Sequence, residues 1–411
     1  MSRVLYVTYD GLLEPLGAAQ VVPYVEGLAR LGVGLTVLSF EKPSDLVDAQ
    51  RCRSMAQRLS SAGIAWIRRR YHRRPSVPAT LYDVAGGIGA ALRATRQAPP
   101  TLIHARGYVA GTIGLACKRI AGASLLFDMR GLWVDERVEA GLWSGDARVT
   151  RAARRLERRL LADADAVVVL TAQAPAMVEA IAGRSLPTVR VIPTCVDLTR
   201  FRPTTDDPAA RVALGLRPEP ALVCAGSLST WYLAEQAFAI GAAFRRAGGG
   251  DFLVLTRETE LADRLDRRFA AGAAIRSVDH DQMPRWLAAC SAGLVAVRPG
   301  EAKRASAPTK VGEYLACGLA VAATGQVGDL DVQLADTPAA FTFDPAEPAE
   351  DVAARLLAIA ARPGRQRAAR ALAERFYALD DGVRAYAKLY GALGVDETPA
   401  SWPADDLREA S

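Results

Sequence analysis

The chain has 411 residues, half of them hydrophobic, and 51 Lys and Arg residues against 45 Asp and Glu residues leave a net charge of +6. This length exceeds what one compact core supports, so it predicts two domains. Neither a run of 18 apolar residues nor a secretory signal pattern is present, which argues against a membrane-spanning protein and favours a cytoplasmic one.

Short β-rich runs alternate with helical patterns from the first residue to about Phe343. The first half predicts strands at 3–9, 35–40, 65–69, 102–106, 125–130, 166–171 and 190–193, and the second half at 221–226, 252–256, 274–278, 293–297, 320–324 and 340–343. Continuous apolar strands separated by helices predict parallel sheets that are covered on both faces. The expected fold class is therefore α/β, with two Rossmann-like doubly wound domains.

A stretch rich in Pro, Asp and Thr, residues 200–221, separates the two series of strands. It predicts an N-terminal domain at 1–203 and a C-terminal domain at 204–378, with closure about a hinge near 202–208. Residues 364–394 carry apolar positions at helical spacing. We expect residues 379–411 to form a helix that returns to the first domain, followed by a loosely docked tail from Val395 to Ser411.

Two arginine-rich runs, 66–75 and 147–162, concentrate the positive charge. In the second, Val149, Leu156 and Leu160 recur at helical spacing, which favours a helix with a solvated basic face. The alternative is attraction to phosphate, either on an acidic substrate or on lipid at the inner face of the membrane. Nucleic acid is not expected as a partner, since no recognised binding module accompanies these runs.

The segment RASAPTKVGEYLACGLAVAATG, residues 304–325, predicts a helix of about ten residues after the strand at 293–297. Ser306 and Thr309 offer N-terminal hydroxyls, and Gly318 offers a stop. Lys310 and Glu313 then lie within a turn of the helix N-terminus, which favours phosphate. Lys310, with Arg298, Lys303 and Arg304, would neutralise a pyrophosphate, while Glu313 would accept hydrogen bonds from a ribose. The alternative is an ordinary exposed ion pair.

Residues 308–329, PTKVGEYLACGLAVAATGQVGD, resemble the donor-binding segment of the retaining nucleotide-sugar glycosyltransferases of family 4. Three further segments, 191–203, 9–32 and 226–232, resemble parts of the same family in the expected order. The resemblance implies the GT-B architecture, in which an N-terminal acceptor-binding domain and a C-terminal donor-binding domain face each other across a cleft. It also implies an enzyme that moves a hexose from a nucleotide diphosphate sugar, with a UDP-sugar favoured, to a saccharide, lipid-linked or natural-product hydroxyl with retention of configuration.

The same resemblance assigns individual residues. Glu313 matches the second glutamate of the family's Glu-x7-Glu motif, but Ala305 stands in place of the first, and the usual Arg and Lys are absent from residues 226–237. The predicted donor site therefore adds neutral groups at Gly226, Ser227, Ser229 and Thr230. Gly17 resembles a loop glycine that lets the backbone approach the donor phosphates, and Gln20 is expected to open the next helix on the acceptor side.

Asp128 and Arg130 end a predicted strand near the position of the family's reacting sugar. With Lys310 they are the predicted catalytic residues. Arg130 is expected to pair with Asp135, Glu136 or a phosphate, or else to anchor its loop. His104 and Arg106 end another strand and are lesser acceptor-side candidates.

The resemblance also implies that no metal ion or other cofactor is needed, because cationic side chains and a helix N-terminus can stabilise the leaving pyrophosphate. The six cysteines contain no Cys-x-x-Cys pair, and the chain has only three histidines, so the sequence does not indicate a metal site. Two alternatives to transfer stay open: a nucleotide-sugar epimerase of the same architecture, and a catalytically silent nucleotide-sugar-binding subunit. The alanine- and arginine-rich composition indicates a bacterial genome, in which polysaccharide or natural-product synthesis would supply the acceptor.

Overall fold

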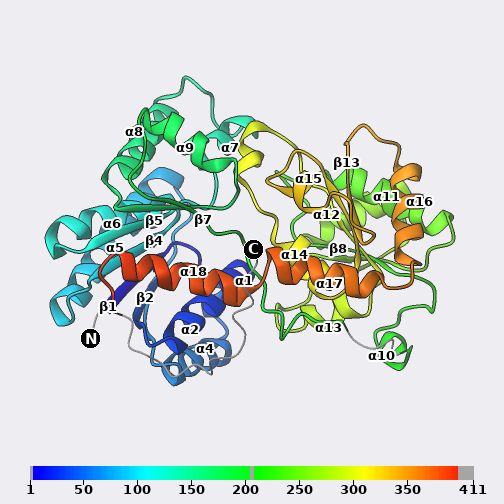
Figure 1. Cartoon of the computed structure of the whole chain (residues 1–411), viewed down its shortest axis with the longest axis horizontal. Helices are drawn as coiled ribbons and strands as arrows, with labels where there is room; N and C mark the ends of the chain where they lie inside the picture. Colours follow the sequence, from blue (N-terminus) through cyan, green and yellow to red (C-terminus); the bar gives the residue numbers. More distant parts are fainter. Residues whose placement is uncertain (1–2, 204–207, 397–411) are drawn as a thin grey trace, which may run out of the picture. The chain divides into compact units, whose positions relative to one another are not determined.

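The computed structural model describes residues 3–203 and 208–396 (Figure 1). The central residues of the expected hinge, 204–207, and the expected tail from residue 397 onward lie outside the described residues. The described chain contains thirteen strands, and each coincides with a predicted one to within a few residues. Both sheets follow directly from the alternation of apolar runs and helices.

The first sheet has seven strands in the order β3-β2-β1-β4-β5-β6-β7. Its strands are β1 Arg3–Thr8, β2 Gly34–Glu41, β3 Ala65–Arg70, β4 Leu102–Arg106, β5 Ser124–Asp128, β6 Ala166–Val169 and β7 Val189–Val191. The helices between them are α1 Pro15–Gln20, α2 Val22–Arg30, α3 Pro43–Leu46, α4 Ala49–Ser61, α5 Ser76–Gln97, α6 Gly107–Ala121, α7 Trp133–Glu139, α8 Arg148–Asp163 and α9 Ala174–Ala182. The strand order reverses direction between β1 and β4.

The second sheet has six strands in the order β10-β9-β8-β11-β12-β13, paired in parallel. They are β8 Leu222–Ala225, β9 Phe252–Leu255, β10 Ala273–Arg276, β11 Ala292–Val295, β12 Ala320–Thr324 and β13 Ala340–Phe343. The remaining helices are α10 Pro208–Ala213, α11 Ala234–Arg246, α12 Thr259–Phe269, α13 Met283–Ala288, the 3₁₀ helix η1 Glu301–Ala305, α14 Thr309–Ala316, α15 Leu330–Gln333, α16 Ala349–Ala360, α17 Arg365–Phe376 and α18 Leu379–Ala392. Here the order reverses between β8 and β11.

Both faces of the second sheet are buried, as its continuous apolar strands predict. Along β8, Leu222 joins a core with Phe238 and Phe252, whereas the next residue, Val223, joins a core with Tyr314. Successive strand side chains point to opposite faces, so a helical layer must cover each face. Helices α11 and α16 contribute to the first core, and α14 and α17 to the second.

The described chain clusters into two compact units. One comprises residues 3–17, 21–126 and 383–396, and the other comprises residues 18–20 and 127–382. Most of α18 thus belongs to the unit that contains β1 to β4: Val383 contacts Gly27, and Tyr390 contacts His104. The predicted boundaries at residues 203 and 378 stay a prediction.

The arginine-rich helix forms over Arg148–Asp163, close to its predicted position. Leu160 is buried as expected, but the other buried residues include Glu157, whose carboxylate accepts a hydrogen bond from Arg154 at 3.1 Å. Arg151, Arg155, Arg158 and Arg159 are exposed. No helix among residues 3–203 and 208–396 combines the length and the apolar character that crossing a bilayer requires.

Candidate functional site

The second sheet brings the predicted donor residues to one place. In open α/β sheets, ligands bind beyond the carboxyl ends of the strands where the strand order reverses. In this sheet the reversal lies between β8 and β11. Gly226, Ser227, Ser229 and Thr230 follow β8, while Arg298, Lys303, Ser306, Thr309, Lys310 and Glu313 follow β11. Every predicted donor residue except Gly17 is therefore at this reversal.

Tyr314 connects the two loops of the reversal. Its ring packs against Gly293 of β11, where an added Cβ would lie 2.3 Å from the ring. Its hydroxyl accepts a hydrogen bond from the backbone N–H of Ala225 at 2.8 Å, at the end of β8. The side chain is fully buried, and this burial raises its pKa well above the ordinary value, so the hydroxyl stays protonated. Helix α14 is thereby held next to Gly226.

Helix α14 begins at Thr309 and ends at Ala316, and Gly318 follows it with a φ of 79°, so the predicted glycine stop is confirmed. The predicted hydroxyl cap is wrong. Pro308 is the N-cap residue and supplies no side-chain hydrogen bond, while the Ser306 hydroxyl instead donates to Glu136 at 3.2 Å. No side-chain cap within the described chain therefore competes with an anion for the first N–H groups of α14.

Lys310 and Glu313 contact each other, with 2.6 Å between Nζ and Oε2. The exposed ion pair considered as an alternative is wrong, because the Glu313 side chain is 1% exposed and the Lys310 side chain 24% exposed. The carboxylate thus lies beneath the ammonium group. A buried carboxylate that keeps a single cationic partner can exchange it for other donors if the cation turns toward a phosphate.

Lys303 has partners that the sequence does not reveal. Its ammonium group is 2.6 Å from Oε1 of Glu136 on α7, and it lies 4.3 Å from the ring centre of Trp231 in the loop after β8. Only 8% of the residue is exposed. Lys303 therefore ties η1 to α7 and to the donor loop, and in this state its charge is already balanced.

The loop after β8 has the backbone of a close turn. Gly226 has a φ of 125° and Thr230 a φ of 58°, and an added Cβ at Gly226 would meet nothing within 4 Å. The glycine is therefore required by its conformation rather than by contacts. The Ser227 hydroxyl donates to Glu258, which follows β9 and also accepts from the N–H of Leu228 at 3.4 Å. Glu258 was missed, because nothing local in TRETE, residues 256–260, marks it as a neighbour of Ser227.

Arg298 is exposed in the loop after β11. Its backbone N–H donates to the carbonyl of Trp231 at 2.8 Å, and Val297 bridges Tyr232. The loops after β8 and β11 thus run side by side. The guanidinium group of Arg298 is positioned at the reversal with its charge toward solvent.

His280 is a second residue that the sequence did not indicate. It is 7% exposed, and its burial lowers its pKa to about 4, although the charge of nearby Glu313 opposes this shift and that of Lys310 supports it. A lone histidine after a predicted strand carries no local signal of this kind. The influence of both charges on its pKa indicates that His280 lies near the Lys310–Glu313 pair.

The loop after β5 carries Asp128 and Arg130. The Asp128 residue is 1% exposed, and its Oδ1 lies 3.6 Å from the Arg130 guanidinium. The expected pairing of Arg130 with Asp135 or Glu136 is wrong: Asp135 pairs with Arg154, and Glu136 pairs with Lys303. Arg130 has a φ of 59° and Gly131 one of 134°, so the backbone of this loop has positive φ at two successive residues.

Gly17 and Gln20 do not lie where the sequence placed them. Gly17 is inside α1 rather than in a loop, because Pro15 starts a helix directly after Glu14. An added Cβ would lie 1.9 Å from the carbonyl oxygen of Gly11, so the glycine permits a close backbone approach within the protein itself. Gln20 ends α1 instead of opening the next helix, is 2% exposed, and donates from Nε2 to the carbonyl of Cys195 at 3.2 Å.

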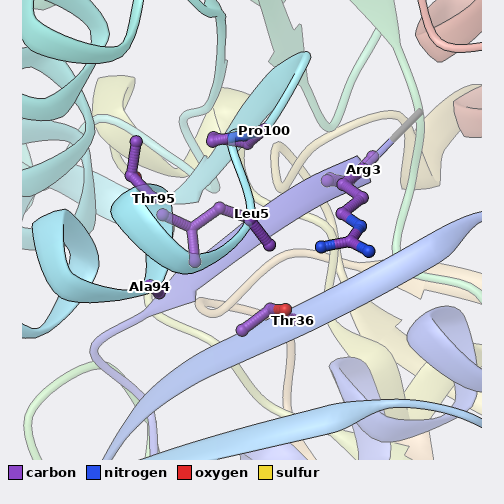
Figure 2. Close-up of a pocket in the computed structure, with 8 residues that line it drawn as sticks. Arg3, Leu5, Thr36, Ala94, Thr95 and Pro100 are labelled. Carbon is purple, nitrogen blue, oxygen red and sulfur yellow. The ribbon is translucent and has the colours of Figure 1, made fainter. Parts of the chain in front are cut away.

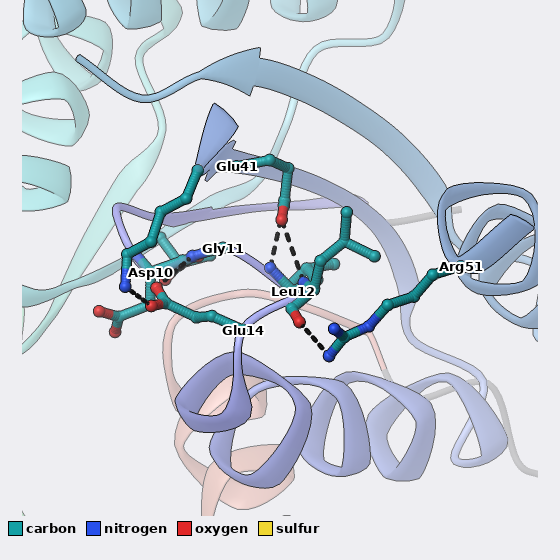
Figure 3. A network of polar contacts seen from close by, with 9 residues as sticks. Asp10, Gly11, Leu12, Glu14, Glu41 and Arg51 are labelled. Atoms are coloured by element: carbon teal, nitrogen blue, oxygen red, sulfur yellow. Dashed lines mark hydrogen bonds and ion pairs between the residues drawn. The ribbon is translucent and has the colours of Figure 1, made fainter. Parts of the chain in front are cut away.

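Figure 3 shows the network that holds the loop after β1. The buried carboxylate of Glu41 accepts hydrogen bonds from the N–H groups of Leu12 and Leu13, at 2.9 and 3.0 Å, and from the Ser39 hydroxyl at 2.6 Å. Glu14 accepts from the N–H of Gly11 at 2.8 Å and pairs with Lys42. A loop at the reversal of the first sheet is thus built on two carboxylates.

His104 and Arg106 end β4 and are both buried. His104 Nδ1 is 2.6 Å from the hydroxyl of Tyr390, and its ring lies 4.2 Å from that of Tyr6. Arg106 is 3.4 Å from Asp10. The packing of His104 under α18 explains its burial, and its role on the acceptor side stays a prediction.

A small pocket lies among Arg3 and Leu5 of β1, Thr36 of β2, and Thr95 and Pro100 near the end of α5 (Figure 2). It is at the amino ends of the strands, opposite the edge where such sheets bind ligands. Its size suits about one water molecule, which would satisfy the buried Thr95 hydroxyl.

Comparison with known proteins agrees with this geometry. Residues 17–195 match the family model described as "Glycosyl transferase 4-like domain". No curated protein matches the sequence.

Three solved structures illustrate the fold. Sucrose-phosphate synthase from Thermosynechococcus elongatus has a TM-score of 0.75 at 17% identity over 96% of this chain and 99% of its own. HepE from Anabaena, in complex with UDP-glucose, has a TM-score of 0.66 at 15% identity over 95% of this chain and 100% of its own. A protein from Listeria monocytogenes, provisionally assigned as a UDP-N-acetylglucosamine 2-epimerase, has a TM-score of 0.63 at 12% identity over 97% of this chain and 99% of its own.

The two parallel Rossmann-like sheets thus define the GT-B fold class, as predicted. Within that class, residues 17–195 are similar to the glycosyl transferase 4-like domain.

Proposed function

We propose that this chain transfers a hexose from a UDP-sugar to a hydroxyl of a saccharide, lipid-linked or natural-product acceptor, with retention of configuration. One observation supports the donor assignment above all others: Lys310 and Glu313 lie in contact at the uncapped N-terminus of α14, where the second sheet reverses its strand order. HepE, which shares the fold, is known in complex with UDP-glucose, and this favours uridine as the base.

In the proposed complex, Lys310 turns from Glu313 to the pyrophosphate. Glu313 then accepts hydrogen bonds from the ribose, and the first N–H groups of α14 face the phosphates. Arg298 adds charge at the mouth of the site, and Gly226, Ser227, Ser229 and Thr230 present neutral donors. Asp128 and Arg130 are proposed to hold the reacting sugar.

The developing negative charge on the leaving pyrophosphate would be stabilised by Lys310, Arg298 and the α14 dipole. We therefore propose that the reaction needs no metal ion or other cofactor. The exposed arginines of α8 remain candidates for a peripheral contact with an anionic membrane surface.

The epimerase alternative has one supporting observation, the fold shared with the Listeria protein. An epimerase needs groups that move protons at the sugar. Two of the three histidines, His104 and His280, are 1% and 7% exposed, so these two are poorly suited to that task. A silent binding subunit is favoured only by the departures at Ala305 and in residues 226–237.

The first experiment measures the melting temperature with UDP, GDP, ADP or dTDP. A ligand that binds only the folded state stabilises it by about 2.7 kcal/mol at a concentration one hundred times its Kd. We expect UDP to raise the melting temperature of the wild type, and Glu313→Gln to weaken UDP binding tenfold or more, because hydrogen bonds to a charged group are worth roughly 1.5–3 kcal/mol.

Glu374→Gln is the matched control, since Glu374 forms an exposed ion pair with Arg370 on neighbouring α17. It should leave the response to UDP unchanged. No stabilisation of the wild type by any of the four nucleotides would refute the donor assignment. UDP binding without turnover of UDP-glucose, UDP-galactose or UDP-N-acetylglucosamine would favour the silent subunit, and release of an epimerised sugar would favour the epimerase.

A further inference from the structure

A second polar cluster lies at the carboxyl edge of the first sheet, apart from the residues assigned above. Tyr9 follows β1, His72 follows β3, and Tyr82 and Asp83 lie in the second turn of α5. These three segments are distant in sequence, but parallel strands end at the same edge of their sheet. All four residues belong to one compact unit.

Asp83 organises the cluster. It is 2% exposed, and its Oδ2 accepts hydrogen bonds from the Tyr9 hydroxyl at 2.8 Å and from the His72 backbone N–H at 2.9 Å. Its Oδ1 is 2.6 Å from Nδ1 of His72. Because a carboxylate only accepts, Nδ1 carries the proton of this hydrogen bond, and Nε2 is the second polar atom of the ring.

The His72 side chain is partly open to solvent, since 37% of it is exposed. The Tyr82 ring stands nearly perpendicular to it, with 5.0 Å between ring centres and an angle of 88°, and Tyr82 is 62% exposed. An oriented imidazole thus lies next to an open aromatic face. Behind them, burial and Asp83 raise the pKa of Tyr9, so its hydroxyl remains a donor to the carboxylate.

We propose that Tyr82 and His72 form a subsite for a sugar ring of the acceptor. The C–H face of a pyranose would pack on Tyr82, and one of its hydroxyls would form a hydrogen bond with Nε2 of His72. Asp83 and Tyr9 act as positioning residues, because they hold the His72 ring and its tautomer from behind. This inference rests on the proposed transfer reaction, whose acceptor class it narrows to saccharides.

A saccharide suits the cluster better than a purely apolar ligand. Sites for small molecules combine aromatic surface with a few oriented polar groups, and both are present here. Leu81, which precedes Tyr82 and is 63% exposed, offers similar apolar exposure on the same helix without a ring. It therefore provides a matched control.

The test measures binding of methyl α-glucoside, methyl α-mannoside and methyl β-galactoside to UDP-loaded protein by saturation-transfer NMR. Tyr82→Ala should weaken binding of the best of these glycosides fivefold or more. His72→Asn keeps an N–H for Asp83 but removes Nε2, and it should weaken binding at least threefold. Leu81→Ala should stay within twofold of the wild type, and all three variants should keep the thermal response to UDP.

Two results would overturn the assignment. If none of the three glycosides binds a wild-type protein that does respond to UDP, no such saccharide subsite exists. If Leu81→Ala weakens binding as much as Tyr82→Ala does, the surface is a general apolar contact, as for a membrane. A wild type that does not respond to UDP refutes the donor assignment instead, and glycoside binding then still decides the role of Tyr82 and His72.

Discussion

At the scale of single residues, Tyr314 connects α14 to the end of β8. It is fully buried, and its hydroxyl satisfies the N–H of Ala225, the residue before the donor loop. Replacement with phenylalanine leaves this buried N–H without its partner, which costs roughly 1–3 kcal/mol. We expect Tyr314→Phe to lower the free energy of unfolding in urea by this amount and to weaken UDP binding.

Tyr82→Phe is the control for that measurement, since it removes a hydroxyl from an exposed tyrosine. It should change the stability by less than about 0.5 kcal/mol, as exposed substitutions usually do. If Tyr314→Phe proves as stable as Tyr82→Phe and binds UDP normally, the bond to Ala225 does not hold α14 against the donor loop.

At the scale of elements, α1 and the loop before it depend on a glycine. The loop is held by Glu41 and Glu14 (Figure 3), and it passes so close to α1 that a Cβ on Gly17 would lie 1.9 Å from the oxygen of Gly11. We expect Gly17→Ala to destabilise the protein by about 1–3 kcal/mol, the usual effect of overpacking. Thermal unfolding followed by circular dichroism measures this.

For Gly391→Ala, in another helix, we expect the opposite effect on stability. Gly391 is in the last turn of α18, and an added Cβ there meets nothing within 4 Å. Alanine should stabilise the helix by about 0.5–1 kcal/mol, because it reduces the freedom of the unfolded chain. A Gly17→Ala protein that melts at or above the temperature of Gly391→Ala would contradict the close approach of the loop and α1.

At the scale of the whole molecule, stability should depend on pH through His280. Burial lowers its pKa to about 4 from 6.5, so the folded state keeps the ring neutral while the unfolded state binds a proton below pH 6.5. Protonation of His280 in the unfolded state therefore costs no stability above pH 6.5. As the pH falls from 6.5 toward 4, the free energy of unfolding decreases by about 1.4 kcal/mol per pH unit, a total loss of about 3 kcal/mol.

The measurement compares urea unfolding of the wild type and His280→Gln at pH 7.5 and 4.5. Carboxylates shared by both proteins contribute equally, so the difference between the two curves isolates His280. We expect the variant to lose less stability on acidification. Equal losses in both proteins would show that His280 titrates normally in the folded state.

The sequence by itself determined the thirteen strands, the α/β class and the clustering of the donor residues after β8 and β11. Apolar runs and helix stops act locally, and parallel topology then places the strand ends at one edge. It also identified the contact between Lys310 and Glu313, because residues three apart on a helix are neighbours.

Only the tertiary structure decided which charges are buried and which side chains meet over long separations. Lys303 pairs with Glu136, Ser227 with Glu258, and His72 with Asp83 and, through it, Tyr9. The tertiary structure also shows that Gly17 and Gln20 belong to α1 and that His104 lies beneath α18. Such pairings depend on how strands and helices pack, and the local sequence around each partner is compatible with many neighbours.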